Sequence, residues 1–440
     1  MSPLCRSLPA AALLLWAAGA VRSQDAASAD RPLADRVGEL EVALKRLDEP
    51  KAPLAGWENG FYLRSPDQDF QLRLTGQVQA DYRGYLNEAD TTDLPTFLVR
   101  RARLGVEATL LRYYEFRLLP DFGRGESRLQ DAYFNLRYWD EFQFEVGKFK
   151  QPFSLEFLIQ DRFVPFVERS ILDQLGPARD VGVMVHGQKL LGDRLDYGVS
   201  VYGGVRDGDG DNDRNKEGAA RLAVRPFRGD GMPDWLGGLQ LGGAGTFGQD
   251  AGAIVTPLLR TPANVPWFAF NTDARPDGTR WRVSPELAYL YGPVLIAAQY
   301  YRESRGYRLG DADLTQTAEG YYVFATLLLT GEERTAISQA VTPLREFNPK
   351  DGGYGPGAVE LVGRVSRVSL TLPAQLYDPD RSAPAATETT LGFNWYLNRW
   401  VRFQFNWEYA HFSRPVRLGE RPTDRLNHQN SFVSRFQIIF

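Results

Sequence analysis

Basic side chains stand at alternate positions in segments where polar and apolar residues alternate. Arg101 and Arg103 are the clearest pair, because Ala102 and Leu104 occupy the positions between and after them. Residues two apart in a strand share a face, so this spacing puts both guanidinium groups on one surface. Arginine keeps its charge at any working pH and presents a flat fork of donors that suits oxyanions. The chemistry that this pattern predicts is electrostatic attraction of small anions along a strand face.

The same alternation predicts that charges of both signs share that face. The expected bases are Arg73, Arg101, Arg103, Arg117, Arg137, Arg221, Arg225, Arg282, Arg364, Arg402 and Arg435. The expected carboxylates are Asp81, Glu107, Glu115, Asp121, Asp131, Glu145, Glu286, Glu360 and Glu408. An arginine track for anions fits this set, and so does an arginine ladder that faces an acidic ladder. All but seven of the 51 basic residues are arginine, which codon usage alone would also explain.

The long connection 151–178 mixes bases with aromatic residues and carboxylates. Lys148 and Lys150 come just before it, and Arg162 and Arg169 lie within it. Its aromatic residues are Phe153, Phe157, Phe163 and Phe166, and its acids are Glu156, Asp161, Glu168 and Asp173. Aromatic side chains of such a loop would anchor it on a wall while the bases face a channel. The acids weaken a purely cationic interpretation.

Metal and catalytic chemistry have little support. The run Asp207, Asp209, Asp211 and Asp213 has the alternate carboxylates of a calcium loop, but Gly218 stands where the terminal bidentate acid belongs. A solvated loop tip is the better interpretation, and we expect no metal and no cofactor. The three histidines, His186, His411 and His428, are scattered, and His411 near Ser413 is the one local hint of a barrel phospholipase. We therefore expect a protein that is not an enzyme.

The elements that must position these charges are strands. Alternation predicts sixteen of them, near 70–83, 96–110, 113–123, 128–138, 142–150, 179–188, 195–203, 217–227, 238–247, 280–290, 294–302, 320–329, 357–371, 388–397, 400–412 and 431–440. The last one ends on the aromatic residue Phe440, which is typical of bacterial outer-membrane barrels. The predicted fold class is all-β, a transmembrane antiparallel barrel whose apolar face meets lipid and whose polar face lines the lumen.

The connections support a barrel, because short and long ones alternate. The expected short, periplasmic ones are 111–112, 139–141, 291–293 and 398–399, and the expected long, external ones are 151–178, 204–216, 248–279, 303–319 and 413–430. The connection 330–355 is long on the side where short turns are expected, and periodicity does not explain it.

The predicted organisation has three parts. Residues 1–23 are expected to be a signal peptide, with Arg6 before an apolar stretch of about a dozen residues. Residues 24–56 are expected to be a periplasmic linker with a short coiled-coil-like helix, because Leu33, Val37, Leu40, Leu44 and Leu47 form a heptad seam. A single amphipathic or disordered linker is the alternative. Residues 57–440 are the expected barrel, and the net charge of −4 argues against a nucleic-acid partner.

Several segments, in order, resemble the phosphate-selective porin O and P family of outer-membrane channels. They are RRARLGVEATL from Arg100, LQDAYFNLRY from Leu129, VGKFKQPFSLE from Val146, VPFVERS from Val164, PARDVGVMVHG from Pro177, LLLTGEE from Leu327, GAVELVGRVS from Gly357 and LGFNWYLNRWVRFQFNWEYA from Leu391. The resemblance implies a sixteen-stranded barrel, a homotrimer, and passive passage of anions past a third external loop that folds into the lumen. It also accounts for the connection 330–355, because the family has an extended segment there.

Resemblance and charge pattern together predict a porin for small anionic solutes in the bacterial outer membrane, with phosphate as the leading candidate. The residues expected at the anion-selective constriction are Arg101, Arg103, Lys148, Lys150, Arg162 and Arg169. Two alternatives stay open: a barrel that serves as an envelope anchor or receptor, and a general non-selective porin. Ion conductance separates a pore from an anchor.

Overall fold

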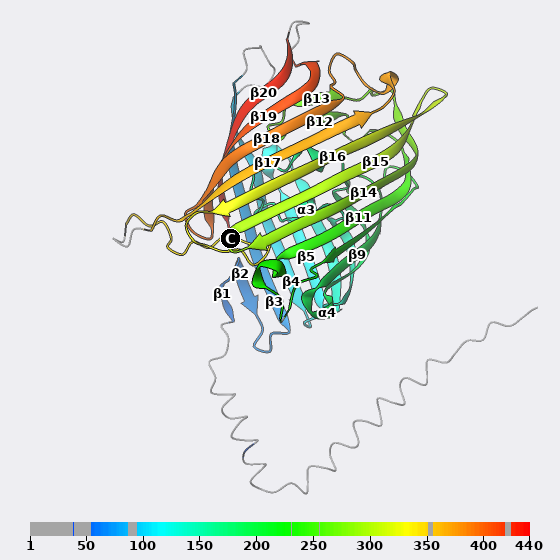
Figure 1. Cartoon of the computed structure of the whole chain (residues 1–440). Coiled ribbons are helices and arrows are strands. Elements are labelled where there is room, and N and C mark those ends of the chain that lie inside the picture. Colours follow the sequence, from blue (N-terminus) through cyan, green and yellow to red (C-terminus); the bar gives the residue numbers. More distant parts are fainter. Residues whose placement is uncertain are drawn as a thin grey trace, which may run out of the picture. The chain divides into compact units, whose positions relative to one another are not determined.

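A computed structural model describes residues 54–86, 95–229, 231–254, 256–350, 355–418 and 424–440, together with Gly38. The predicted signal peptide lies outside the described residues, and so does the heptad seam. Residues 54–440 form one compact unit, an antiparallel sheet of 18 strands that curls into a barrel (Figure 1).

Sixteen of these strands make up the closed wall, and each overlaps one of the predicted segments. They are β3 (Phe70–Tyr85), β4 (Thr96–Leu110), β5 (Tyr114–Asp121), β6 (Arg128–Trp139), β7 (Phe142–Lys150), β8 (Arg179–Lys189), β9 (Leu195–Tyr202), β10 (Glu217–Val224), β11 (Leu239–Ala251), β14 (Arg275–Tyr291), β15 (Val294–Leu309), β16 (Ala312–Leu328), β17 (Ala358–Thr371), β18 (Ala385–Tyr396), β19 (Val401–Arg417) and β20 (Arg425–Ile439).

The barrel closes where the last strand pairs with the first. β20 runs antiparallel to β3 from the pair Ser431 and Tyr85 to the pair Ile439 and Gln77. Phe440 continues the pairing, since its N–H donates to the Gly76 carbonyl (3.0 Å) and its carbonyl accepts from the Gly76 N–H (2.7 Å). The two remaining strands, β1 (Ala55–Trp57) and β2 (Phe61–Arg64), form a hairpin beside the first residues of β3. The predicted sixteen-stranded all-β barrel is confirmed.

The wall strands turn apolar residues outward and most of their polar residues inward, and β15 and β16 also turn Tyr301 and Phe324 inward against the constriction loop. On β3 and β4, Val78 and Leu104 are 41% and 49% exposed, whereas Gln79 and Arg101 are 0% and 6% exposed. Paired neighbours obey the same rule, because Val78 lies opposite Ala102 and Gln79 opposite Arg101. A soluble protein has the reverse arrangement, so this pattern requires a lipid environment outside and a polar interior.

The two ends of the barrel differ in their connections. At the short-turn end, the connections are 111–113, 140–141, 190–194, 225–238, 292–293, 329–357 and 397–400. At the long-loop end, 151–178 and 252–274 are the longest. Two predicted loops are wrong, because β15 and β16 extend until only Gly310 and Asp311 join them, and β19 and β20 likewise cover most of 413–430. Alternation weakens above the membrane, but hydrogen bonding between strands continues there.

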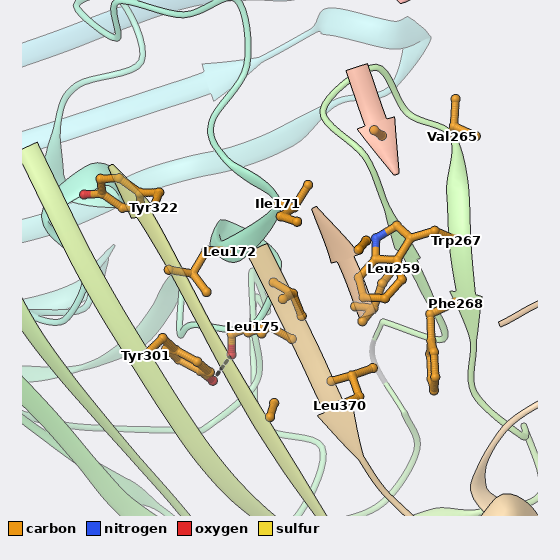
Figure 2. Close-up of a cluster of buried hydrophobic side chains, with 14 of the residues drawn as sticks. Ile171, Leu172, Leu175, Leu259, Val265, Trp267, Phe268, Tyr301, Tyr322 and Leu370 are labelled. Carbon is orange, nitrogen blue, oxygen red and sulfur yellow. Dashed lines mark hydrogen bonds between the residues drawn. The ribbon is translucent and has the colours of Figure 1, made fainter. Parts of the chain in front are cut away.

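Three connections fold toward the barrel axis. The constriction loop, 151–178, contains α3 (Leu155–Leu158) and η2 (Ile171–Gln174). The connection 252–274 contains the hairpin β12 (Leu258–Arg260) and β13 (Pro266–Ala269). Figure 2 shows Ile171, Leu172 and Leu175 of the constriction loop between the wall and the side chains of this hairpin. The third is the inner segment, residues 332–343 of the connection 329–357 at the short-turn end.

The other helical turns are η1 (Gly123–Gly125), α4 (Leu190–Asp193), α5 (Asp234–Gly237) and η3 (Ala374–Leu376). None of the helices in the described part of the chain is long and apolar enough to cross a membrane.

Candidate functional site

Side chains of the wall hold the constriction loop inside the barrel. Asn406 accepts a hydrogen bond from the Val167 N–H (2.7 Å), and Asn394 donates to the Pro165 carbonyl (2.8 Å). Arg364 donates to the Glu168 carbonyl (2.9 Å). A loop buried in a lumen must satisfy its backbone groups, and the inward polar residues of β17 to β20 supply the partners.

Glu168 of the loop is surrounded by four arginines of the wall. Its carboxylate lies 2.5 Å from Arg100, 3.1 Å from Arg435, 3.2 Å from Arg83 and 3.6 Å from Arg101. Burial alone would raise the pKa of Glu168, but these guanidinium groups outweigh it and hold the pKa well below its usual range. Glu168 is therefore an ionised anchor for arginines from three strands.

Asp161 is a second anchor of the same kind. Its carboxylate lies 2.5 Å from Arg103, 2.7 Å from Arg169, 3.6 Å from Arg179 and 3.7 Å from Arg101. Burial opposes its ionisation, yet the arginines, led by Arg169, keep the pKa of Asp161 well below its usual range. Arg101 lies between the two anchors and joins them.

A β-bulge brings Arg100 into the lumen beside Arg101. Along β3, Gln79 pairs with Arg101 and Ala80 pairs with Val99, so Arg100 is an extra residue in β4. Strict alternation would turn one of two adjacent arginines toward lipid. A bulge re-aims side chains, and here it lets both neighbours reach Glu168.

Two cavities flank these anchors. The outer cavity, about 410 Å³ on the long-loop side, is lined by ten arginines and six carboxylates, which leaves an excess of four positive charges. The inner cavity, about 190 Å³, is lined by five bases and three carboxylates. Arg103, Asp161 and Arg179 line both, so they lie between the cavities. These three residues mark the constriction.

The structure brings five of the six predicted site residues to this constriction. Arg101, Arg103 and Arg169 converge on Asp161 as described. Lys150 donates to the carbonyls of Phe157 (2.5 Å) and Ile159 (3.0 Å), and so supports the loop backbone. Arg162 lines the inner cavity, where its Nε donates to the Gln160 side-chain oxygen (2.9 Å).

Lys148 is placed differently. It pairs with Val181 across β7 and β8, lines neither cavity, and donates to the Asp209 carboxylate at 2.5 Å. Phe149, which lies between Lys148 and Lys150, lines the inner cavity, so the two lysines lie on the opposite face of β7. Lys150 still reaches the constriction loop because it is the last residue of the strand. The Asp209 contact also explains part of the acidic run, in which Asp211 pairs with Lys216 (2.8 Å). Among the described residues, no group of three or more potential ligands is placed to hold a metal.

Sequence reasoning missed Arg83, Arg100 and Arg179. The alternation of polar and apolar residues could have predicted Arg83, since it lies two residues from Asp81 and on the same strand face. Arg179 stands at the start of β8, where Asp131 accepts from it at 2.6 Å. Arg100 required knowledge of the bulge.

On one part of the wall, formed by β10, β11, β14 and β15, charges are balanced. Arg280 lies between Glu217 and Asp250, Arg282 contacts Glu217 and Glu303, and Arg305 contacts Asp250. Three bases thus meet three acids on the wall opposite the anchors. On this wall bases and acids pair side by side, whereas the two cavities beside the anchors are lined by an excess of bases.

The sequence and the fold are similar to those of known proteins. The family model for phosphate-selective porin O and P matches residues 72–440. Porin O of Pseudomonas aeruginosa is 23% identical over 432 residues, which cover 87% of this chain and 91% of that protein.

Among solved structures, the outer membrane channel DcaP of Acinetobacter baumannii superposes with a TM-score of 0.53 at 11% identity, covering 86% of this chain and 99% of that one. OmpT of Vibrio cholerae gives 0.52 at 13% identity with the same coverage. These similarities show the barrel fold. Together with the family match over most of the sequence, they identify a channel and not an enzyme: the chain belongs to the phosphate-selective porin O and P family and is a porin of the bacterial outer membrane.

Proposed function

We propose that this porin passes small anions by passive diffusion, with phosphate as the leading candidate. The observation that carries the proposal is the excess of four positive charges around the outer cavity. A narrow channel with low-dielectric walls focuses such a field and raises the local concentration of anions. The description of the family, phosphate-selective porin O and P, supports phosphate in particular.

Arginines can serve a passing anion while they hold the loop. Each guanidinium carries five N–H donors, and Arg103 uses two of its nitrogens, toward Asp121 and Asp161. Ion pairs with Asp161 and Glu168 fix the orientation of each guanidinium group, and its remaining N–H donors face the pore. The proposed selectivity residues are therefore Arg101, Arg103, Arg162 and Arg169, with Lys150 as support of the loop.

Block of chloride current by phosphate in planar bilayers tests the proposal. Phosphate should reduce wild-type chloride conductance in a saturable way, and Arg101→Ala with Arg103→Ala should weaken the block several-fold. Arg302→Ala is a matched control, because Arg302 pairs with Glu319 on exposed parts of the strands and lines neither cavity. Equal block in wild type and the double variant would contradict the assignment.

A general porin with little charge preference is the second candidate. The balanced pairs around Glu217 and Asp250 favour it, because neutralised charges contribute little to a field. Current without block by phosphate and without preference between potassium and chloride would support it.

We further propose that residues 1–23 are removed on export and that the heptad seam of residues 33–47 associates in a homotrimer. The support is the spacing of its five apolar residues. Deletion of residues 30–50 should lower the melting temperature of the detergent-solubilised trimer or shift it toward monomers in size analysis. An unchanged trimer with unchanged melting would remove this role.

A further inference from the structure

The inner segment enters the barrel from the short-turn end and is fixed there. Arg334 donates to Glu360 at 2.7 Å and to the Tyr396 hydroxyl at 3.3 Å, and both Arg334 and Glu360 are buried. Val341 packs in an apolar cluster with Leu328, Ala358 and Tyr396. A buried ion pair with an apolar cluster beside it leaves this part of the segment little freedom.

A turn in this segment presents Ser338 to the lumen. The Gln339 side-chain oxygen accepts from the N–H groups of Thr335 and Ala336 (3.1 Å each) and from the Thr335 hydroxyl (2.8 Å). These three bonds close the turn 335–339 on itself. The Ser338 hydroxyl is therefore held by a rigid platform.

Ser338 contacts the constriction loop. Its hydroxyl oxygen accepts a hydrogen bond from the Gln160 N–H at 3.0 Å. The neighbouring residues Arg162 and Phe163 line a small cavity of about 10 Å³ together with Gln339, Ala340 and Val341. A loop that enters from one end of the barrel thus meets a segment that enters from the other.

Gln160 in turn orients Arg162, the least restrained of the predicted site residues. Among the described residues, Arg162 is bound by neither a carboxylate nor a backbone carbonyl. Its guanidinium donates to the Gln160 side-chain oxygen at 2.9 Å and lies over the face of Phe163. Gln437 fixes the backbone of Arg162 by donating to its carbonyl (3.1 Å). The direction of this positive charge depends on Gln160.

We propose that Ser338 is a positioning residue for Arg162, so that the inner segment sets the charge preference where the pore opens from its inner cavity toward the periplasm. The inference rests on the proposed anion pore and adds a second selectivity element on its periplasmic side. Without the Ser338 hydroxyl, the Gln160 N–H loses its partner, the loop shifts, and the guanidinium of Arg162 no longer faces the inner cavity.

Reversal potentials in a salt gradient test this, with wild type, Ser338→Ala, Ser338→Thr, Arg162→Ala and the double variant Ser338→Ala with Arg162→Ala. Ser338→Ala should move the reversal potential toward zero, and Ser338→Thr, which keeps a hydroxyl acceptor, should restore it. Ser338→Ala should cause no further change in the Arg162→Ala background, because the serine acts through the arginine. If Ser338 had only a structural role, Ser338→Ala would shift the reversal potential equally in the wild type and in the Arg162→Ala variant.

Folding is checked by the heat-modifiable migration of the barrel in gels. If Ser338→Ala does not fold, Gln160→Ala, which removes the oxygen that orients Arg162, should produce the same shift. An anion-selective wild type with an unchanged reversal potential in Ser338→Ala and Gln160→Ala would overturn this inference alone. A cation-selective wild type would overturn the proposed function itself.

Discussion

At the scale of the residue, two carboxylates organise the constriction. Asp161 and Glu168 each face four arginines within 4.0 Å. A buried arginine without a partner is costly, and like charges repel, so an uninterrupted ring of guanidinium groups would not pack. One carboxylate shared among several arginines removes most of that cost and leaves a positive excess for anions.

The pKa values of these carboxylates predict an acid-resistant constriction. A carboxyl group whose pKa is lowered by folding stabilises the folded loop above its ordinary pKa and loses that contribution only as pH falls through the lowered value. Asp161 and Glu168 are of this kind. Glu156 behaves in the opposite way, because burial raises its pKa although Arg364 acts to lower it. Its contribution to the stability of the folded loop is therefore fully present at low pH and declines as the pH rises.

Anion preference should therefore not fall as the pH is lowered from about 8 to about 5, since ordinary carboxyl groups titrate near pH 4 and these two titrate lower still. Reversal potentials across this range provide the measurement. A loss of preference centred between about pH 6 and about pH 7 would contradict the assignment of Asp161 and Glu168 as ionised anchors.

At the scale of the element, irregularities in the strands determine the site. Sequence periodicity predicted all sixteen wall strands and the inward face that carries Asp81, Arg103 and Arg435. It did not predict the bulge at Arg100, because a bulge depends on how two paired strands share their hydrogen bonds. Nor did it predict that Lys148 pairs with Asp209, because that contact joins residues 61 positions apart.

Arg100→Ala tests the bulge. Glu168 would lose its shortest ion pair but keep Arg83, Arg101 and Arg435, so docking of the loop should weaken by about 1.5 to 3 kcal/mol. Single-channel recordings should then show more frequent open-state fluctuations, or a larger conductance.

Arg128→Ala is the matched control for that experiment. Arg128 also lines the outer cavity, but it pairs with Glu126 at the exposed rim. Its loss should lower the cavity charge without adding fluctuations. Equal current noise in both variants would argue against a special role for Arg100.

At the scale of the whole molecule, closure depends on a close approach between the two ends of the barrel sheet. The ring of Phe440 lies over Gly76, where an added Cβ would stand 1.9 Å from its Cζ atom. Trp57 of the β1 hairpin lies against the same ring, with centroids 5.9 Å apart. A glycine at position 76 therefore lets the terminal aromatic residue cover the seam.

Gly76→Val should destabilise the barrel by about 1 to 3 kcal/mol, because the ring must leave its place. Equilibrium unfolding by denaturant in detergent or lipid measures the change. At Gly210 an added Cβ meets no atom within 4 Å, so Gly210→Val should leave the midpoint unchanged. Equal midpoints for both variants would show that the Phe440 seam does not limit stability.

The sign of the pore's selectivity is the central claim, and the reversal potential of the purified wild-type protein in a potassium chloride gradient tests it most directly. Ten arginines against six carboxylates in the outer cavity predict that chloride is more permeant than potassium at neutral pH. The reversal potential should lie toward the chloride equilibrium potential. A reversal potential on the potassium side would mean that the inward carboxylates dominate the field, and it would contradict the account.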